Sequence, residues 1–160
     1  MAIGLGGNVG SPEAAFAVAL AGLAHHVEGL VCSPLYLTAP VGGPPQPDFL
    51  NAVATGRTFL PPFGLLELLK RLEAEAGRPV SGESNGPRPL DLDLLLYDGL
   101  RIDLPELVVP HPRLATRRFV LAPLADLLPD LVVPGTGRTV ASLLEAAPPA
   151  RVERQAASPS

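Results

Sequence analysis

The order of apolar and polar residues along the chain predicts alternating strands and helices. Stretches with the two-residue period of strands are separated by longer stretches with the period of a helix. Strands are predicted at residues 2–6, 29–38, 49–59, 89–97 and 100–104, and helices within residues 7–26, 60–77, 113–130 and 139–147. This β-α-β-β-α-β order, with further helices late in the chain, predicts an α+β fold. We expect a ferredoxin-like core with a mostly antiparallel sheet and helices on both faces, which is a three-layer sandwich.

Local signals mark where several of these elements begin and end. Ser11 is expected to cap the first helix, and Gly77 is expected to end the second. Pro123 is expected to interrupt the third helix, because proline lacks a backbone N–H. The pair Asp98-Gly99 predicts a two-residue hairpin turn that joins the strands on either side of it.

Composition favours one compact domain. The 160 residues suffice for one hydrophobic core, and 47% hydrophobic with 18% charged residues is typical of a folded protein. We expect residues 1–146 to form this domain and residues 147–160 to be a flexible C-terminal tail. Cys32 is the only cysteine, which excludes a disulfide within the chain.

Charge and hydropathy narrow the class of function. The net charge of −4 argues against a broad nucleic-acid interface. No apolar run is long enough for a membrane span, and the N-terminus lacks the basic start of a signal peptide. We therefore expect a cytoplasmic protein with no nucleic-acid or membrane partner, and a monomer, with a dimer as the alternative. Lys70, the only lysine, follows no glycine-rich turn, which excludes a Walker A nucleotide site.

Two aspartates interrupt the most apolar strand of the chain. In "PLDLDLLLY", Asp91 and Asp93 share one face, because residues i and i+2 of a strand point the same way. Leu90, Leu92 and Leu94 then point to the opposite face, into the core. Carboxylates at the edge of a core need a partner. On this spacing two interpretations stay open: the pair binds a divalent cation, or it lies on a solvated strand face or pairs with arginines.

Basic residues on both sides of this strand favour phosphate chemistry. Arg78 and Arg88 lie in the polar loop before it, and "VPHPRLATRRF" follows it. Phosphoryl transfer requires a metal ion held by carboxylates, with arginines close to it. A solvated helix start with a basic edge is the alternative. The second segment supplies His111, Arg113, Arg117 and Arg118.

The chain also resembles the 6-hydroxymethyl-7,8-dihydropterin pyrophosphokinase family. Its "GPRPLDLDLLLYDG" is similar to the family signature, "GLGGNVGSPEAAF" to the opening turn and helix, and "SPLYLTAPVGGPPQPDFLNAV" to the pterin loop. The likeness covers residues 2 to 145. It implies transfer of pyrophosphate from ATP to the pterin hydroxymethyl oxygen with release of AMP, in folate biosynthesis. ATP and the pterin would be the substrates, and two Mg²⁺ ions the cofactors.

The resemblance implies roles for individual positions. Asp91 and Asp93 would bind the magnesium ions, and Arg78 and Arg88 would act with them in catalysis from a loop that closes over the site. The positions implied to bind the pterin are Thr38, Pro40, Val41, Phe49, Asn51 and Phe119. The positions implied to bind ATP are Glu73, Arg88, His111 and Arg117.

The chain departs from the family pattern at several positions. Gly7 stands where serine is common, and Phe49 replaces a tyrosine that is often present, which removes one hydroxyl. Asn85 stands where some members have tryptophan, and the loop around it lacks further basic residues. Loop closure is therefore expected to use different contacts, while the aspartates and the loop arginines are retained.

Three other functions share part of this evidence. A two-metal nucleotidyltransferase or nuclease would use the same pair of aspartates but has no use for a pterin pocket. A non-catalytic binding module would balance the aspartates with arginines. A dinucleotide-binding fold is suggested by "GLGGNVG", which departs from the G-x-G-x-x-G pattern at Val9.

Overall fold

The computed structural model describes residues 1–40, 45–77 and 89–155. The strands are β1 (Ala2–Gly7), β2 (Val27–Cys32), β3 (Tyr36–Thr38), β4 (Phe49–Thr58), β5 (Asp91–Leu96), β6 (Ile102–Leu104), β7 (Leu107–Val109), β8 (Val132–Val133), β9 (Arg138–Thr139) and β10 (Val152–Arg154). The helices are α1 (Pro12–Ala24), α2 (Pro62–Glu75), the short 3₁₀ helix η1 (Leu114–Thr116), α3 (Arg118–Leu127) and α4 (Val140–Ala146).

One antiparallel sheet organises the chain. Its strand order is β10-β3-β4-β1-β5, and β2 pairs with β4 beside this path. Every pairing in it is antiparallel, with Gly6 of β1 opposite both Asn51 of β4 and Asp91 of β5. The expected combination of helices with a mostly antiparallel sheet is therefore confirmed. Two further hairpins, β6–β7 and β8–β9, lie outside this sheet.

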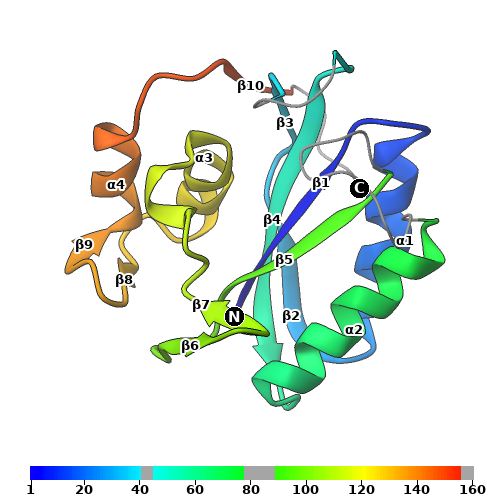
Figure 1. Cartoon of the computed structure of the whole chain (residues 1–160), viewed down its shortest axis with the longest axis horizontal. Helices are drawn as coiled ribbons and strands as arrows, with labels where there is room; N and C mark the ends of the chain where they lie inside the picture. The colour runs from blue at the N-terminus through cyan, green and yellow to red at the C-terminus, as the bar shows by residue number, and fades with distance from the viewer. Residues whose placement is uncertain (41–44, 78–88, 156–160) are drawn as a thin grey trace.

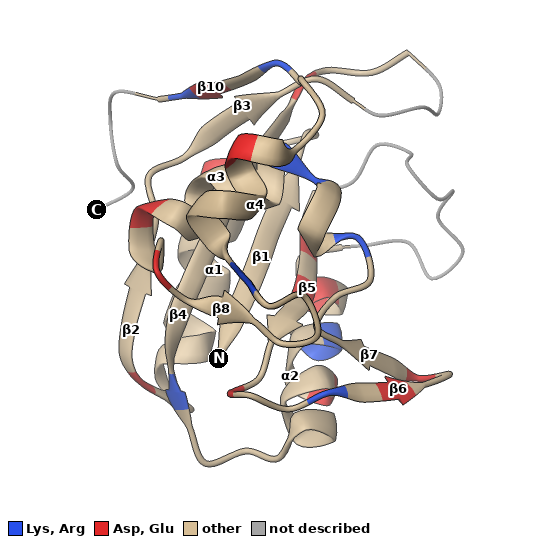
Figure 2. Ribbon diagram, turned by 90° about the vertical axis from the view of Figure 1, so that its left-hand side faces the viewer, with Lys and Arg blue, Asp and Glu red and all other residues tan. Residues whose placement is uncertain are grey.

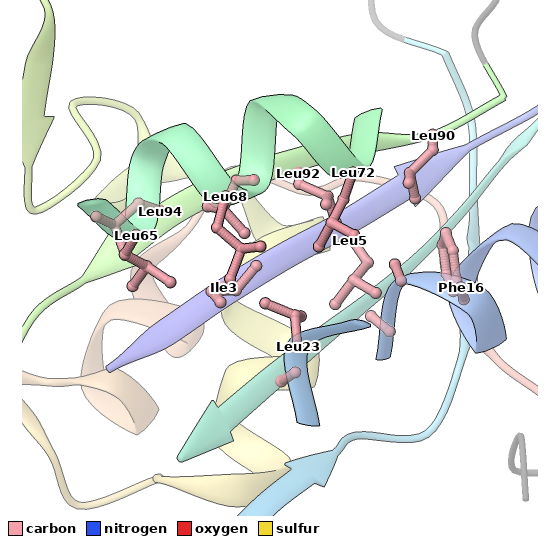
Figure 3. Packing of buried hydrophobic residues seen from close by; sticks show 14 of the residues in the cluster. Ile3, Leu5, Phe16, Leu23, Leu65, Leu68, Leu72, Leu90, Leu92 and Leu94 are labelled. Atoms are coloured by element: carbon pink, nitrogen blue, oxygen red, sulfur yellow. The ribbon is translucent and has the colours of Figure 1, made fainter. Parts of the chain in front are cut away.

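Helices cover both faces of the sheet (Figure 1). On one face, α1 and α2 pack on the strands through a cluster of buried residues that includes Ile3, Phe16 and Leu65 (Figure 3). On the other, α3 and α4 pack through a second cluster that includes Val53 and Leu121. Full burial of each large aliphatic side chain contributes about 1.5–3 kcal/mol. In the described ranges, no helix has both the length and the apolar character needed to cross a membrane.

The predicted ends of α1 and α2 are confirmed. The Ser11 side chain accepts a hydrogen bond from the Ala14 backbone N–H at 3.4 Å, and Pro12 occupies the first turn of α1. Gly77 follows the end of α2 with φ +89°, a conformation that glycine adopts without the steric cost of a side chain. These short-range signals act within a few residues, which is why the sequence alone locates them.

The hairpin expected at Asp98-Gly99 is wrong in its pairing. A turn does form, since the Leu100 N–H donates to the Tyr97 carbonyl at 3.1 Å and Asp98 has φ 53°. However, β6 pairs with β7 and not with β5. A tighter turn at residues 105–106 places Leu104 opposite Leu107, so β6 finds its partner in the strand that follows.

The expected interruption at Pro123 is also wrong. Helix α3 runs continuously from residue 118 to residue 127 with Pro123 inside it. A proline in a helix gives up one backbone hydrogen bond, but Pro123 is buried here among the residues that α3 packs against the sheet. Tertiary packing thus overrides the local preference.

Part of the segment expected to be a flexible tail belongs to the sheet. Within residues 147–160, Val152–Arg154 form β10, which pairs with β3 through Val152 opposite Thr38 and Arg154 opposite Tyr36. The edge of β3 offers unpaired backbone groups, and β10 satisfies them. The domain boundary at residue 146 stays a prediction.

Replacement of Gly56 by alanine should destabilise the fold. A Cβ at this position would lie 2.4 Å from Val27 Cγ1 and 3.0 Å from the Glu28 carbonyl oxygen, where β2 pairs with β4. Overpacking of this kind costs about 1–3 kcal/mol of unfolding free energy, measurable by urea denaturation. Gly99→Ala is the matched control, because nothing lies within 4 Å of its Cβ. Equal stabilities for the two variants would contradict the packing described.

Candidate active site

A cavity of about 360 Å³ lies between the sheet and the beginning of α3. Strands β1, β4 and β5 form its floor, and the segment from β7 into α3 forms the opposite wall. Most of the residues expected to form the site line this one cavity: Thr38, Phe49, Asn51, Asp91, Asp93, His111, Arg117 and Phe119. Residues far apart in sequence are brought together because neighbouring strands carry those of the floor, and because the segment from β7 into α3 lies opposite them.

Strand β5 presents two different faces. Asp91 and Asp93 line the cavity, while Leu92 and Leu94 are buried against the α2 side of the sheet, with 5% and 4% exposure. The predicted alternation is confirmed. Both carboxylates also interact with other groups of the protein. The strand therefore holds two carboxylates on one side of a rigid element.

Glycines on β1 leave room above the floor. Gly4 lies opposite Asp93, and Gly6 lies between Asp91 on one side and Asn51 on the other. A Cβ on Gly6 would meet the Asn51 side-chain oxygen at 3.0 Å. The absence of a side chain at Gly6 therefore allows the Asn51 amide to lie over the strand, between the carboxylates and β3.

The Asn51 side chain is held in one orientation. Its Nδ2 donates to Thr38 Oγ1 at 2.6 Å, and both residues are buried, with 9% and 3% exposure. An amide fixed in this way presents its oxygen as a directed acceptor. Phe49, two pairs further along the ladder from Asn51 and on the same face of β4, also lines the cavity, so apolar and amide surfaces lie side by side.

The wall opposite the carboxylates is cationic. The pKa of Arg117 is lowered, first by burial and then by the nearby charge of Arg113. The carboxylates of Asp93 and Asp91 act in the opposite direction and raise it. Burial first, and then Arg117 and Arg113, lower the pKa of His111. His111 Nδ1 accepts the Arg113 backbone N–H at 3.2 Å, which leaves Nε2 to carry the proton of the neutral ring.

Phe119 contributes an aromatic face. The Arg117 guanidinium carbon lies 5.3 Å from the centroid of its ring, which is within the range of a cation–π contact. Both side chains line the cavity. The aromatic ring and the amide of Asn51 thus belong to opposite walls of the same space, as a flat polar ring would require.

Other expected residues lie elsewhere. Ala39 lines the cavity. Pro40, the next residue, is not among the described residues that line it. Glu73, on α2, accepts a hydrogen bond from the Leu92 backbone N–H at 2.7 Å, at the edge of β5. Arg118 turns away and donates to the Ala147 carbonyl at 2.8 Å. Val41, Arg78 and Arg88 are outside the described residues.

Sequence reasoning missed some of the lining. Gly4 and Gly6 follow the strand period of two, but only the register with β5 shows that they face the aspartates. Arg113 belongs to the basic segment, but no motif in the sequence assigns it a role of its own. Further lining residues not expected as site residues are Leu5, Ala39, Ala52, Val53, Leu95, Pro112 and Val120. These small and apolar residues resemble any buried strand or helix residue, so the sequence carries no signal for them.

The paired aspartates fit magnesium. Mg²⁺ in proteins takes one or two carboxylates and completes its shell with water and substrate phosphates. Among the described residues, no group of three or more His, Cys, Asp or Glu side chains converges to form a complete metal cage. Two carboxylates opposite a cationic wall have the chemistry to hold a cation together with an anionic substrate.

Comparison with known proteins gives a consistent result. The sequence profile of the 7,8-dihydro-6-hydroxymethylpterin-pyrophosphokinase (HPPK) family matches residues 2–129. A Pseudomonas aeruginosa 2-amino-4-hydroxy-6-hydroxymethyldihydropteridine pyrophosphokinase is 44% identical over 154 residues, which cover 95% of this chain and 94% of that protein. A Synechocystis protein of the same name is 41% identical, over 89% of this chain and 73% of its own length.

Longer proteins match as well. The mitochondrial folate synthesis bifunctional protein of Arabidopsis thaliana is 47% identical over 81% of this chain, which is 24% of that protein. The crystal structure of wild-type Plasmodium falciparum HPPK-DHPS with SDX-DHP superposes with a TM-score of 0.69 at 14% identity, over 91% of this chain. This chain spans 43% of that structure, and the likeness concerns the fold.

His111 should titrate below pH 6.5 in the protein without magnesium or nucleotide. Burial and the two arginines lower its pKa from 6.5 in the folded state. The unfolded chain then binds the proton more readily, so the free energy of unfolding should fall as pH decreases from 6.5 towards the folded pKa. NMR titration of the imidazole measures the midpoint. Arg113→Gln should raise it, and a midpoint at or above 6.5 would contradict the geometry.

Proposed function

Because this chain belongs to the 7,8-dihydro-6-hydroxymethylpterin-pyrophosphokinase family, we propose that it transfers pyrophosphate from ATP to the hydroxymethyl group of 6-hydroxymethyl-7,8-dihydropterin and releases AMP. The reaction belongs to folate biosynthesis. One observation supports this most directly: the cavity joins a carboxylate pair, a fixed amide and a cationic wall in one space. These are the groups that a metal-bound triphosphate and a flat heterocycle need.

The pterin ring would bind between β4 and α3. Asn51 would read the amide-like edge of the ring, since its orientation is already fixed by Thr38. Phe119 would stack on the ring, in the place that Arg117 covers in the free protein. Phe49 would close the apolar side. Thr38, Pro40 and Val41 complete the proposed pocket.

The phosphates would lie over β5. Asp91 and Asp93 would hold two magnesium ions, and magnesium bound there would neutralise phosphate charge and lower the pKa of the pterin hydroxyl. Arg117 would offset charge on the transferring group from the opposite wall. The Nε2–H of neutral His111 would donate to a phosphate oxygen.

The loop before β5 supplies the remaining proposed groups. Arg78 and Arg88 would stabilise the transferring pyrophosphoryl group, and Arg88 would also contact ATP. Glu73 is proposed to lie near the ATP ribose. Its described contact, with the Leu92 N–H, already places its carboxylate at the outer edge of the strand that carries the aspartates.

Several features disfavour the alternatives. Both neighbours of β1 run antiparallel to it, whereas the dinucleotide fold needs a parallel β-α-β unit at "GLGGNVG". A nucleotidyltransferase or nuclease would share Asp91 and Asp93 but leaves the pre-oriented Asn51 amide without a role. A non-catalytic module would not need one cavity that contains both the aspartates and the Asn51 amide.

The remaining proposals concern the setting of the enzyme. We propose a monomeric cytoplasmic enzyme, with a dimer as the alternative, that acts on ATP and the pterin and has neither a nucleic-acid nor a membrane partner. We also propose the ferredoxin-like description of the core. It is supported by the strand order around β1 and by α1 and α2 on one face.

The product of ATP distinguishes the reactions. The purified protein is mixed with ATP, magnesium and 6-hydroxymethyl-7,8-dihydropterin, and the nucleotide product is identified by chromatography. Pyrophosphate transfer releases AMP in proportion to the pyrophosphorylated pterin. Release of ADP, or of pyrophosphate, would instead indicate a phosphokinase or a nucleotidyltransferase and would contradict the proposal.

Asp93→Ala should remove turnover. Loss of one of the two carboxylates should lower kcat by about 100-fold or more, because metal-assisted charge stabilisation is worth several kcal/mol. It should also abolish magnesium-dependent ATP binding in calorimetry. Asp130→Ala is the matched control, since this exposed aspartate lies beyond the end of α3. Near-normal transfer by the Asp93 variant would refute the metal assignment.

A further inference from the structure

The C-terminal strand β10 carries an arginine that joins three elements around the cavity. We propose that Arg154, acting through Asp126 and Tyr36, is a positioning residue that sets the spacing between the Phe119 wall and the wall formed by Asn51. This inference rests on the proposed function, because it concerns how tightly the pterin ring is held.

The cluster is formed by hydrogen bonds between β3, α3 and β10. The Tyr36 hydroxyl donates to the Asp126 carboxylate, and the Arg154 guanidinium donates to the other oxygen of that carboxylate. Arg154 Nε also donates to the Tyr36 hydroxyl at 3.2 Å, and the guanidinium lies 5.8 Å from the centroid of the Tyr36 ring. Tyr36 is 7% exposed. A network with each member held by both others restricts the movement of all three elements.

The cluster lies on the same elements that frame the ring site. Tyr36 pairs directly with Asn51 across the β3–β4 ladder, and Thr38 follows on the same face of β3. Asp126 lies seven residues, or about two helical turns, beyond Phe119 on α3. A shift of α3 relative to β3 would therefore change the separation of the two walls. Figure 2 shows β10 alongside β3, which it pairs with in the sheet.

A second contact holds the residue before β10 next to a residue that lines the same site. Arg151 Nη2 lies 2.6 Å from the Asp48 carboxylate, next to Phe49 at the start of β4. Val152 pairs with Thr38 between these two anchors. The strand is thus attached at both ends to the pterin side of the cavity.

The position in the sheet predicts which substrate is affected. The order β10-β3-β4-β1-β5 puts the cluster of Tyr36, Asp126 and Arg154 near one edge of the sheet and the aspartates at the other edge. Loss of a hydrogen bond in this cluster should therefore weaken binding of the pterin and leave binding of magnesium and ATP unchanged. A role in global stability alone would not separate the two substrates.

Steady-state kinetics with each substrate varied in turn test the proposal. Arg154→Ala should raise KM for the pterin about three- to tenfold, while kcat and KM for ATP change less than twofold. Arg154→Lys, which keeps the charge, should recover part of the loss. Arg138→Ala is the matched control, since this arginine of β9 bonds Ser142 on α4 and should leave every constant unchanged. Equal KM values for Arg154→Ala and the wild type would overturn the proposal, as would an equal rise in KM for both substrates.

Charge reversal at the second anchor gives an independent test if Arg154→Ala does not fold. Asp48→Arg should raise KM for the pterin about two- to fivefold, and the double variant Asp48→Arg/Arg151→Asp should restore it, because the exposed ion pair is re-formed with opposite polarity. No effect of the single change, or no restoration by the second, would show that attachment of β10 does not control binding of the pterin, and would overturn the proposal. The wild type in parallel separates the two questions: failure to use the pterin at all refutes the proposed function.

Discussion

The division of β5 between two layers is the constraint on which the rest of the site depends. Because side chains alternate along a strand, the leucines that fasten β5 to α2 force the aspartates between them onto the opposite face. That face would ordinarily be covered by the next layer. Here the glycines of β1 leave it open, and α3 begins only at the far wall. The core that stabilises the sheet thus also determines where the carboxylates point.

Charge is distributed across the cavity in a way that suits a large anionic substrate. Acidic groups lie on the floor and arginines on the wall, where partial burial and the arginines bias the half-buried His111 imidazole towards its neutral form. A triphosphate with its cation would satisfy both surfaces at once, with the cation on the floor and phosphate oxygens towards the wall. The fixed amide at the other end of the cavity provides a separate polar contact for a ring. In the proposed reaction, the triphosphate and the pterin ring would therefore meet over β1.

Much of this arrangement is predictable from short-range patterns. The alternation in "PLDLDLLLY", the cap at Ser11 and the stop at Gly77 depend on neighbours within a few residues, and all three predictions are confirmed. The errors involve competition between distant or alternative partners. Strand β6 pairs with β7, which follows it, instead of with β5, which precedes it. Pro123 lies inside α3, where its packing outweighs the local preference of proline.

The site shows the same limit. Asp91 and Asp93 could be placed on one face from spacing, but the glycines opposite them are identified only by register. Arg113, Arg117 and Arg118 are near neighbours in sequence, yet the first two line the cavity and the third bonds the end of α4. The role of β10 was hidden because a short polar strand in a proline-rich segment resembles a loose end.

We propose that a divalent cation, held by Asp91 and Asp93, organises the cavity. A crystal structure with magnesium and a non-hydrolysable ATP analogue tests it most directly. We expect magnesium bonded to oxygens of both aspartates at about 2.0–2.1 Å, with the analogue's phosphates completing the coordination. A structure in which the nucleotide is bound while both carboxylates pair only with arginines would contradict it.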